Sequence, residues 1–431
     1  MAKSRKKTHH PASSAGLYIL AFLAFATAWA MVMAVRWANA PVLRAPDLLP
    51  LAGFGGACLA IGLFTRFSGF RGDRLLPPLT LLLAGIGMAV QFRLGSLDFA
   101  NPTQASTLAY GLGFLGYLVT WMVFRQGRYA LLSGMALPCL LLASGVLAVI
   151  LMMGQRFRGA VFLAGQMNPA EVIKLLLAIF LAGVITDFRK PLQQTVAGLP
   201  APPAKSLITL GVLWAIPMAL LMLQRDLGMM ILLNVTLLVL VFMATGKWGY
   251  LVLGAGFAGV AGYGGFHFFD HARARMIAWQ DPFVDPTGSG WQILQALSAM
   301  FTGGMWGSGL GAGAPTVVPI AASDFVYAAL AEELGFIGCA LIVLIYLLVF
   351  YRGYRIADQV RAPFAQTLAA ALTTLLALQT LMNLGGVTKA IPLTGITLPL
   401  ISHGGSSLVT SLIMLGLLTA LSEPPPAKSR G

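Results

Sequence analysis

The sequence has little charge and few acidic residues. Of its 431 residues, 14 are Asp or Glu and 28 are Lys or Arg, so charged residues make up only 10%. Soluble domains carry about 25% charged residues, and this chain cannot cover a water-facing surface in the usual way. A cytosolic enzyme and a disordered protein are therefore excluded. Hydrophobic residues make up 58% of the chain, which places it among polytopic membrane proteins.

Cysteine is also scarce. Cys58, Cys139 and Cys339 all lie in apolar stretches and show no CxxC spacing. Buried free thiols behave as small hydrophobic groups, so we expect neither a disulfide framework nor a cysteine metal site.

The apolar runs are long enough to cross a bilayer, which takes roughly 20 residues. They predict an all-α polytopic membrane protein with about twelve transmembrane helices and one large extracytoplasmic loop. The predicted spans are 16–36, 48–66, 76–93, 107–124, 130–152, 170–187, 206–223, 227–245, 248–268, 328–351, 364–385 and 404–421.

The positive charges predict the orientation of these spans. The basic stretches are MAKSRKKTHH, Arg66–Arg74, Arg125–Arg128, Arg189–Lys190, Arg352–Arg361 and Lys428–Arg430. With twelve spans all of them fall on one side, which the positive-inside rule makes cytoplasmic. The net charge of +14 then reflects orientation, and no nucleic acid partner is expected. The predicted regions are a cytoplasmic tail 1–15, helices 16–268, an extracytoplasmic loop 269–325, helices 326–421 and a cytoplasmic tail 422–431.

Ionisable residues in or beside spans are functional hypotheses by default. Glu171 and Lys174 stand at i and i+3, so they share a helix face and can pair. A pair that only neutralises itself is an equally good interpretation. Glu332 and Glu333 open the tenth span, and one of them is expected to be solvated or to interact with the helix dipole.

The predicted outer loop 269–325 is the most informative stretch. It contains Arg273, Arg275, Asp281, Asp285 and Asp324, together with many glycines and tryptophans. The segment ILQALSAMF within it has the pattern of an amphipathic helix lying at the interface. Loops of this length are usually functional, so we expect an ordered cap that carries a reaction or binding site.

A second polar stretch, NLGGVTKAIPLTGITLPLISHGGSSLVT, follows the eleventh span and is broken by Pro and Gly. Such backbone at membrane depth must pack in protein or line a cavity. Ser402 beside His403 does not predict nucleophilic catalysis, because no Asp or Glu is near. Gly404–Ser407 is better interpreted as a turn that supports the cavity.

These residues resemble the motifs of the SEDS family (shape, elongation, division and sporulation), which includes the RodA and FtsW proteins. The matching positions are Arg158, Asn168–Glu171 and Lys174; Gln224–Gly228; Trp279, Pro282, Asp285 and Gly288–Gln292; Asp324–Phe325 and Glu332–Gly335; and Leu398–Pro399 with Ser402–Ser407. Gly159, Asn168, Ala170, Arg225 and His403 depart from the family pattern and mark a divergent member. The first two spans look like an addition to a ten-span core, and GVTKAIPLTG is similar to the RodA branch.

The resemblance implies a peptidoglycan glycosyltransferase that polymerises lipid II at the outer face of the bacterial inner membrane. The donor is α-linked and the glycan is β-linked, so the transfer inverts and needs one general base. The family's matching carboxylate is Asp285, which we favour over Asp281 because Asp281 lies outside the motif. The implied substrate-binding residues are Arg158, Glu171, Lys174, Arg273, Arg275, Trp279, Gln292, Lys389 and Ser406.

The resemblance also implies a class B penicillin-binding protein transpeptidase as partner, in addition to lipid II and membrane lipid, with both termini cytoplasmic. A divalent cation, Mg²⁺ or Mn²⁺, is compatible with a diphosphate substrate, but no ligand spacing demands one. A transporter or flippase for a lipid-linked precursor is the main alternative, and an inactive scaffold is a third. A role in elongation, division or sporulation stays open.

Overall fold

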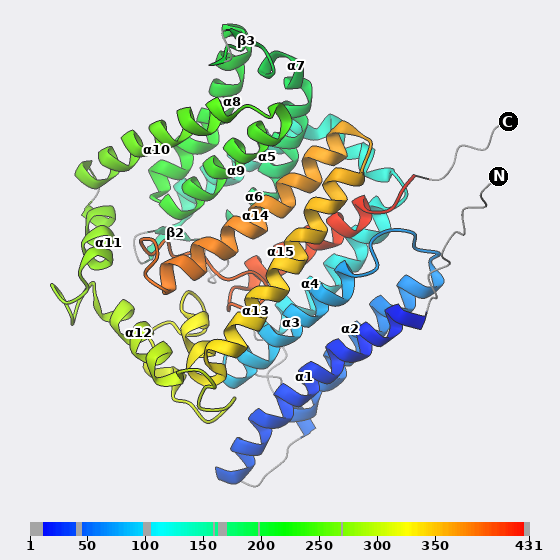
Figure 1. Cartoon of the computed structure of the whole chain (residues 1–431), viewed down its shortest axis with the longest axis vertical. Coiled ribbons are helices and arrows are strands. Elements are labelled where there is room, and N and C mark those ends of the chain that lie inside the picture. The colour runs from blue at the N-terminus through cyan, green and yellow to red at the C-terminus, as the bar shows by residue number, and fades with distance from the viewer. Residues whose placement is uncertain are drawn as a thin grey trace, which may run out of the picture.

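The computed structural model describes residues 12–39, 45–97, 105–157, 160–162, 170–196, 199–268 and 270–425. It is a helical bundle with two short hairpins (Figure 1). Each of the twelve predicted spans coincides with a helix, and that prediction of an all-α membrane fold is confirmed. The corresponding helices are α1 (Ala12–Asn39), α2 (Ala45–Phe67), α3 (Leu76–Arg93), α4 (Ala105–Phe124), α5 (Ala136–Met153), α6 (Ala170–Asp187), α8 (Ala204–Gln224), α9 (Leu227–Thr245), α10 (Trp248–Phe268), α13 (Val326–Gln359), α14 (Pro363–Val387) and α15 (Gly405–Leu421).

The remaining elements are short. They are the 3₁₀ helices η1 (Arg128–Met135) and η2 (Pro315–Val317), the helices α7 (Arg189–Leu192), α11 (Asp270–Gln280) and α12 (Trp291–Gly303), and the strands β1 (Gln155–Phe157), β2 (Ala160–Phe162), β3 (Thr195–Val196) and β4 (Leu199–Pro200). β1 pairs antiparallel with β2, and β3 with β4. In the described part of the chain, nine helices are long and apolar enough to cross a membrane, and α15 is a shorter apolar helix.

Helix α14 forms the centre of the bundle, where it packs against α6, α9, α13 and α15 (Figure 1). Its buried face carries small and polar residues as well as apolar ones. Helices α1 and α2 lie at the edge of the bundle, and α1 packs along α3. Most residues of these two apolar helices are not covered by other parts of the protein, as expected for spans that contact lipid.

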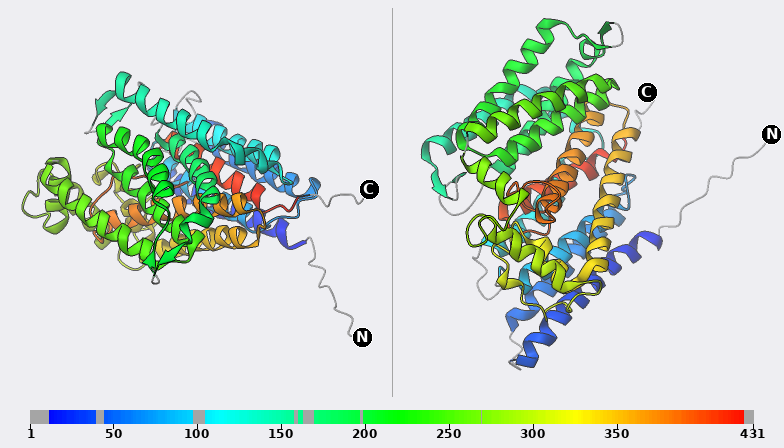
Figure 2. Two further views of the ribbon diagram at one scale, coloured as in Figure 1. Left: turned by 90° about the horizontal axis from the view of Figure 1, so that it is seen from above. Right: turned by 60° about the vertical axis from the view of Figure 1, so that its left-hand side comes forward.

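The two ends of the bundle differ in composition. The start of α1 and the end of α15 lie at one end, whereas α11 and α12 lie toward the other (Figures 1 and 2). At the first end Arg125 pairs with Glu423 at 3.1 Å, and Arg352 pairs with Asp73. This end holds several of the predicted basic clusters, and the other end holds the 269–325 segment.

That segment is more helical than predicted. The amphipathic helix expected at ILQALSAMF is present as α12, with Ile293, Ala296 and Ala299 on its buried face. The HARARM stretch, for which no helix was predicted, forms α11. Its apolar periodicity is weak, and contacts with the 388–395 segment stabilise it, as described below.

The first turns of α13 are separated from the rest of the helix by a break at Gly335, where φ is +66° and ψ is −174°. The backbone of residues 304–309 fills this break. Ser308 N and Gly309 N donate to the carbonyl oxygens of Glu332 and Glu333, each at 3.0 Å, and Phe336 N donates to Gly304 O at 2.9 Å. Irregular backbone at membrane depth must be satisfied by protein, and the inserted loop does this. The predicted tenth span is therefore divided at Gly335 into a short first helical piece and a longer second one.

We expect Gly335→Ala to destabilise the protein by about 2–4 kcal/mol, because it combines an unfavourable φ with a steric clash. A Cβ at Gly335 would lie 2.3 Å from Gly307 N. The measurement is the thermal unfolding midpoint in detergent. Gly145→Ala in α5 is the matched control, because a Cβ there meets nothing within 4 Å. An equal midpoint for the two variants would contradict the role of the break.

Candidate functional site

A buried ion pair lies in the first turns of α6. Lys174 is fully buried, and its Nζ contacts the Glu171 carboxylate. The same Nζ donates to Gln379 Oε1 of α14 at 2.6 Å. A buried charge needs both a counterion and hydrogen-bond partners, and Lys174 has them from two helices. The predicted pairing of Glu171 with Lys174 is thus present and linked to α14.

Gln379 extends this network to the polar segment between α14 and α15. Its Nε2 donates to Thr397 O at 3.0 Å and lies 3.3 Å from Ser407 Oγ. Thr397 Oγ1 donates to Ser407 Oγ at 2.8 Å. We call Glu171, Lys174, Gln379, Thr397 and Ser407 the polar junction. It joins α6, α14 and the first turn of α15, where Ser406 is half-buried beside Ser407.

Arg275 connects α11 to the bundle next to this junction. Its Nη1 donates to Leu393 O at 3.2 Å and to Thr394 O at 3.0 Å. Burial lowers the pKa of Arg275, and the nearby carboxylates of Asp324 and Asp226 oppose that effect. Arg275 therefore fastens α11 to the 393–394 backbone between two acidic groups.

Asp226 links the two groups of charges. It is the N-cap of α9, and its Oδ1 accepts from Met229 N at 3.0 Å. Burial raises the pKa of Asp226, and the hydrogen bond from Met229 N opposes this effect. The Glu171 carboxylate raises this pKa further, whereas the Arg275 guanidinium lowers it. Glu171, Asp226 and Arg275 are thus close enough to interact. The preceding residue, Arg225, stands where the family motif has proline, and its φ of +61° is one that proline cannot adopt.

The C-terminal end of α11 contacts the same inter-helix segment. Trp279 Nε1 donates to Lys389 O at 3.0 Å, and Lys389 Nζ lies 3.4 Å from Gln280 O. Two predicted binding residues, Trp279 and Lys389, are therefore neighbours although 110 positions separate them. Arg273 is exposed on α11 and has an interaction partner of its own.

Asp285 lies in the loop between α11 and α12, at the periphery of the bundle (Figure 1). Its side chain is exposed. Oδ1 accepts from Gly288 N at 3.1 Å, and Oδ2 accepts from Ser289 N at 2.7 Å and from Ser289 Oγ at 3.1 Å. These hydrogen bonds, led by that from Ser289 N, lower the pKa of Asp285. In this conformation the carboxylate is ionised, and its described hydrogen-bond partners all belong to its own loop.

Steric crowding explains why glycine stands at two positions of the Gly-Ser-Gly-Trp-Gln motif. A Cβ at Gly288 would lie 2.2 Å from Asp285 Oδ2, and one at Gly290 would lie 2.0 Å from Pro282 O. Both positions need glycine so that the loop can close around the carboxylate. Gln292 follows in the first turn of α12 and is half-buried.

Glu332 and Glu333 contradict one prediction. Neither is solvated, since their exposed fractions are 8% and 3%. Glu332 Oε1 accepts from Ala314 N at 2.8 Å, and Glu333 pairs with Arg93 Nε at 2.9 Å and accepts from Gly311 N at 3.0 Å. The expectation of a solvated carboxylate was wrong because residues 311–314, which follow the loop that fills the break, bring backbone donors to both side chains. Neither residue lies in the first turn of α13, so the alternative of an N-terminal carboxylate is not met either.

The predicted serine and histidine also have structural partners. Ser402 is buried, donates its hydroxyl to Ser323 O at 2.6 Å and accepts from Leu398 N at 2.8 Å. His403 N donates to Ala322 O at 2.6 Å. These contacts attach the inter-helix segment to the residues before α13. Gly404–Ser407, predicted as a supporting turn, are instead the N-cap and first turn of α15.

The structure brings together some of the predicted site residues. Glu171, Lys174 and Arg275 meet at or beside the polar junction, with Ser406 next to it, and Trp279 and Lys389 meet at the end of α11. Asp285 and Gln292 lie on the loop beyond α11, and no described hydrogen bond or ion pair joins Asp285 to the junction. Arg158 lies outside the described residues.

Sequence reasoning missed Gln379 and Asn383, which both stabilise the site. Asn383 Nδ2 donates to Asp324 O at 2.9 Å and to Ile396 O at 2.8 Å. The two residues stand at i and i+4 in an apolar span, so they share one helix face. Polar residues repeated at that spacing in a span would have predicted the face of α14 that lines the site.

Carboxylates outnumber cations in the described part of the site. Lys174 and Arg275 lie among Glu171, Asp226 and Asp324, so five ionised side chains there would carry one net negative charge. The described residues contain no group of three His, Cys, Asp or Glu side chains suited to a metal ion. The protein groups described here therefore do not fit a metal held by side chains alone, and we derive no step through one.

Comparisons with known proteins identify the family of the chain. A family model described as cell cycle protein, for FtsW, RodA and SpoVE, matches residues 75–424. Peptidoglycan glycosyltransferase RodA of Mycobacterium tuberculosis is 36% identical over 385 residues, which cover 86% of this chain and 81% of that protein.

Solved structures show the same fold. A chain of a peptidoglycan synthase complex that coordinates polymerization and crosslinking has a TM-score of 0.65 at 26% identity, covering 82% of this chain and 98% of that one. The rod shape determining protein RodA of Thermus thermophilus has a TM-score of 0.57 at 24% identity, over 82% and 97% of the two chains, and supports the fold alone. The chain belongs to the FtsW, RodA and SpoVE family of membrane proteins, the SEDS family that its motifs resemble.

Proposed function

We propose that this protein is a peptidoglycan glycosyltransferase that polymerises lipid II into β-1,4 glycan strands. The observation that carries the proposal is the 36% identity to a protein named peptidoglycan glycosyltransferase RodA over 86% of the chain. The positions that resemble the family motifs include Asp285 and, in the polar junction, Glu171, Lys174 and Ser407. The polar junction joins segments far apart in the sequence.

The reaction is a single displacement at the anomeric carbon of the donor sugar. The 4-oxygen of the acceptor sugar forms the new bond to that carbon, while the bond to the polyprenyl diphosphate breaks and the diphosphate leaves. The acceptor hydroxyl loses its proton to a base. Because the donor bond is α and the new bond is β, one displacement with one base is sufficient.

Asp285 is our choice for the base. Two carboxylate oxygens offer about four lone-pair sites, and loop donors occupy three of them. The remaining site is on Oδ1, where it can accept the acceptor's hydroxyl proton. Gly288 and Ser289 hold the carboxylate in place, and the loop position gives it access to a substrate at the membrane surface.

The cations divide into two groups in this proposal. Arg158, Arg273 and Lys389 bind the diphosphate, where positive charge stabilises the leaving group. Lys174 is already paired with Glu171 and supports the site from α6, whereas Arg275 donates to backbone carbonyls and positions α11. Trp279, Gln292 and Ser406 contact the sugar and headgroup, and Glu171 orients Lys174.

The same proposal includes the topology. Both termini are cytoplasmic, because the basic clusters then lie inside, and the 269–325 segment is extracytoplasmic. The protein is thus a multi-pass protein of the bacterial inner membrane with its site at the outer leaflet. A class B penicillin-binding protein is the proposed partner, supported by the similarity to a chain of a peptidoglycan synthase complex.

The test is reconstitution of the purified chain, with and without a transpeptidase of that class, in proteoliposomes containing fluorescent lipid II. We expect glycan strands that gel electrophoresis resolves as a ladder. Movement of lipid II across the bilayer without any ladder would contradict the polymerase and favour the transporter, whose polar sites are typically near the midplane.

The pH dependence of the rate follows from Asp285. The base acts as a carboxylate, and its pKa is lowered from the ordinary 3.8, so it stays ionised until the pH falls below that value. We therefore expect no loss of polymerisation from Asp285 between about pH 8 and pH 5. A pH–rate profile checks this. An acidic limb in that range that shifts in Asp285→Glu would contradict it.

A further inference from the structure

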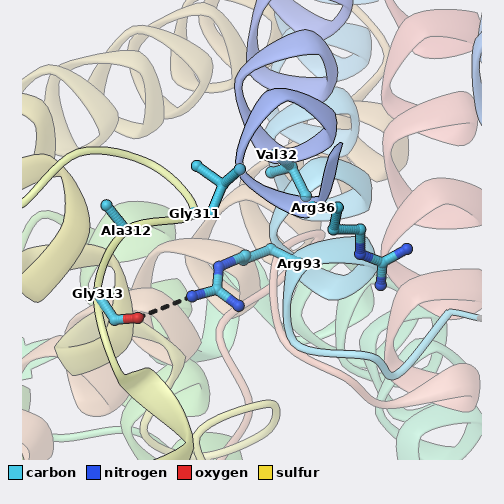
Figure 3. Close-up of a pocket in the computed structure, with 7 residues that line it drawn as sticks. Val32, Arg36, Arg93, Gly311, Ala312 and Gly313 are labelled. Carbon is cyan, nitrogen blue, oxygen red and sulfur yellow. Dashed lines mark hydrogen bonds between the residues drawn. The ribbon is translucent and has the colours of Figure 1, made fainter. Parts of the chain in front are cut away.

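A cavity of about 360 Å³ lies between α1, the end of α3 and residues 311–313, which follow the loop that fills the break in α13. It is lined by Val32, Val35 and Arg36 of α1, by Arg93 of α3 and by residues 311–313 (Figure 3). None of these residues belongs to the polar junction. Helix α1 precedes residue 75, where the family match begins, so the cavity uses a segment outside the shared core.

Two arginines line the cavity, and only one of them pairs with a described carboxylate. Arg93 donates from Nε to Glu333 at 2.9 Å and from Nη2 to Gly313 O at 2.8 Å. Arg36 stacks over the Phe92 ring at 4.6 Å, and no described carboxylate is within ion-pair distance of it. In Figure 3 the Arg36 guanidinium is turned away from Gly313, so the two arginines do not share that acceptor. Glu332 also lies beside Gly313, where its Oε1 accepts from Ala314 N, so the charges near the cavity balance overall and Arg36 is the guanidinium that no described carboxylate pairs with.

The position of the cavity along α1 indicates which kind of anionic ligand could reach it. Arg36 is in the last turn of α1, whose apolar span runs from Ala15 to Ala38, so the cavity lies where the span meets the bilayer surface. The neighbouring Trp37 is 61% exposed, as is common for residues at that depth. Val32 and Val35 of α1 provide an apolar wall, and exposed Ala312 lies on the opposite wall.

We propose that this cavity binds the phosphodiester headgroup of an anionic phospholipid such as phosphatidylglycerol. Guanidinium groups match phosphate oxygens in geometry and charge, and basic pockets between transmembrane helices are suited to anionic headgroups. The glycerol and first acyl carbons pack against Val32 and Val35. Because Arg93 also donates to Gly313 O and to Glu333, a bound headgroup stabilises the contact of α3 with residues 311–313 and with the first turns of α13.

The test is retention of lipid by the full-length protein, measured by native mass spectrometry after titration with phosphatidylglycerol, phosphatidylcholine or inorganic phosphate. We expect retained phosphatidylglycerol, with Arg36→Gln weakening binding by about tenfold or more. Ala312→Glu, which adds a carboxylate at an exposed lining position, has the same effect. The uncharged Ala312→Gln and the exposed Arg66→Gln in α2 leave retention unchanged.

Several results would overturn the proposal. If phosphatidylcholine is retained as well as phosphatidylglycerol, the cavity does not discriminate by headgroup charge. If inorganic phosphate binds as well as phosphatidylglycerol, the lipid is not required. Unchanged retention in both Arg36→Gln and Ala312→Glu would place the lipid elsewhere. The readout is independent of polymerisation, and the two variants remain interpretable separately if one folds poorly.

Discussion

Asp285→Asn lowers the rate of lipid II polymerisation by about 10²–10⁴-fold, the contribution usual for a positioned general base. Asparagine keeps the size of the side chain, and with its oxygen at the Oδ2 position it can still accept from Ser289 N, but its NH2 group cannot accept from Gly288 N. It cannot take the proton of the acceptor hydroxyl. The measurement is the initial rate of strand formation at saturating lipid II.

Asp281→Asn is the matched control for that variant. Asp281 stands four positions earlier in the same loop, where its Oδ1 accepts from Phe283 N at 2.9 Å, and it is also exposed. We expect its rate within a few-fold of the wild type. If Asp281→Asn loses as much activity as Asp285→Asn, the loss does not identify Asp285 as the base. Full activity of Asp285→Asn would contradict the assignment of Asp285 directly.

Lys174→Met reduces stability by about 3–5 kcal/mol, because it leaves the Glu171 carboxylate buried without its cation. It also removes the donor to Gln379 Oε1. Methionine fills a similar volume, so loss of packing is not the main cause. Unfolding in mixed micelles of increasing denaturing detergent content measures the change in the free energy of unfolding.

The double variant Glu171→Gln with Lys174→Met separates charge from shape. Replacing both members of a buried pair is often nearly neutral, so it should recover most of the lost stability. Lys190→Met, at an exposed position in α7, controls for loss of a lysine. If Lys174→Met is as stable as Lys190→Met, the ion pair does not support the bundle.

The sequence predicted the fold well because lipid imposes a simple rule. A span must be apolar over about 20 residues, and run length alone therefore located all twelve helices. The break in α13 could not be predicted, because Gly335 is acceptable within a helical pattern. Only the tertiary insertion of residues 304–309 explains its conformation. Helix α11 was missed for a related reason, since the contacts of Arg275 and Trp279 stabilise it more than its own periodicity does.

The site was predictable in its residue types and less so in its geometry. Glu171 and Lys174 pair as their spacing indicates, but their link to Gln379 depends on α14 packing against α6. Arg275 reads in the sequence as a free cation of the outer loop, whereas in the structure it donates to backbone carbonyls between two acidic side chains. Charge counted along a sequence does not show which cations are already compensated.

The stereochemistry of the product tests the central claim most directly. Purified protein is incubated with lipid II, and the product is digested with a muramidase specific for β-1,4 bonds. An inverting glycosyltransferase that uses the Asp285 loop yields strands that are cut completely to disaccharide units. Strands that resist the enzyme, or the absence of any strand while lipid II is consumed or moved, would contradict the account.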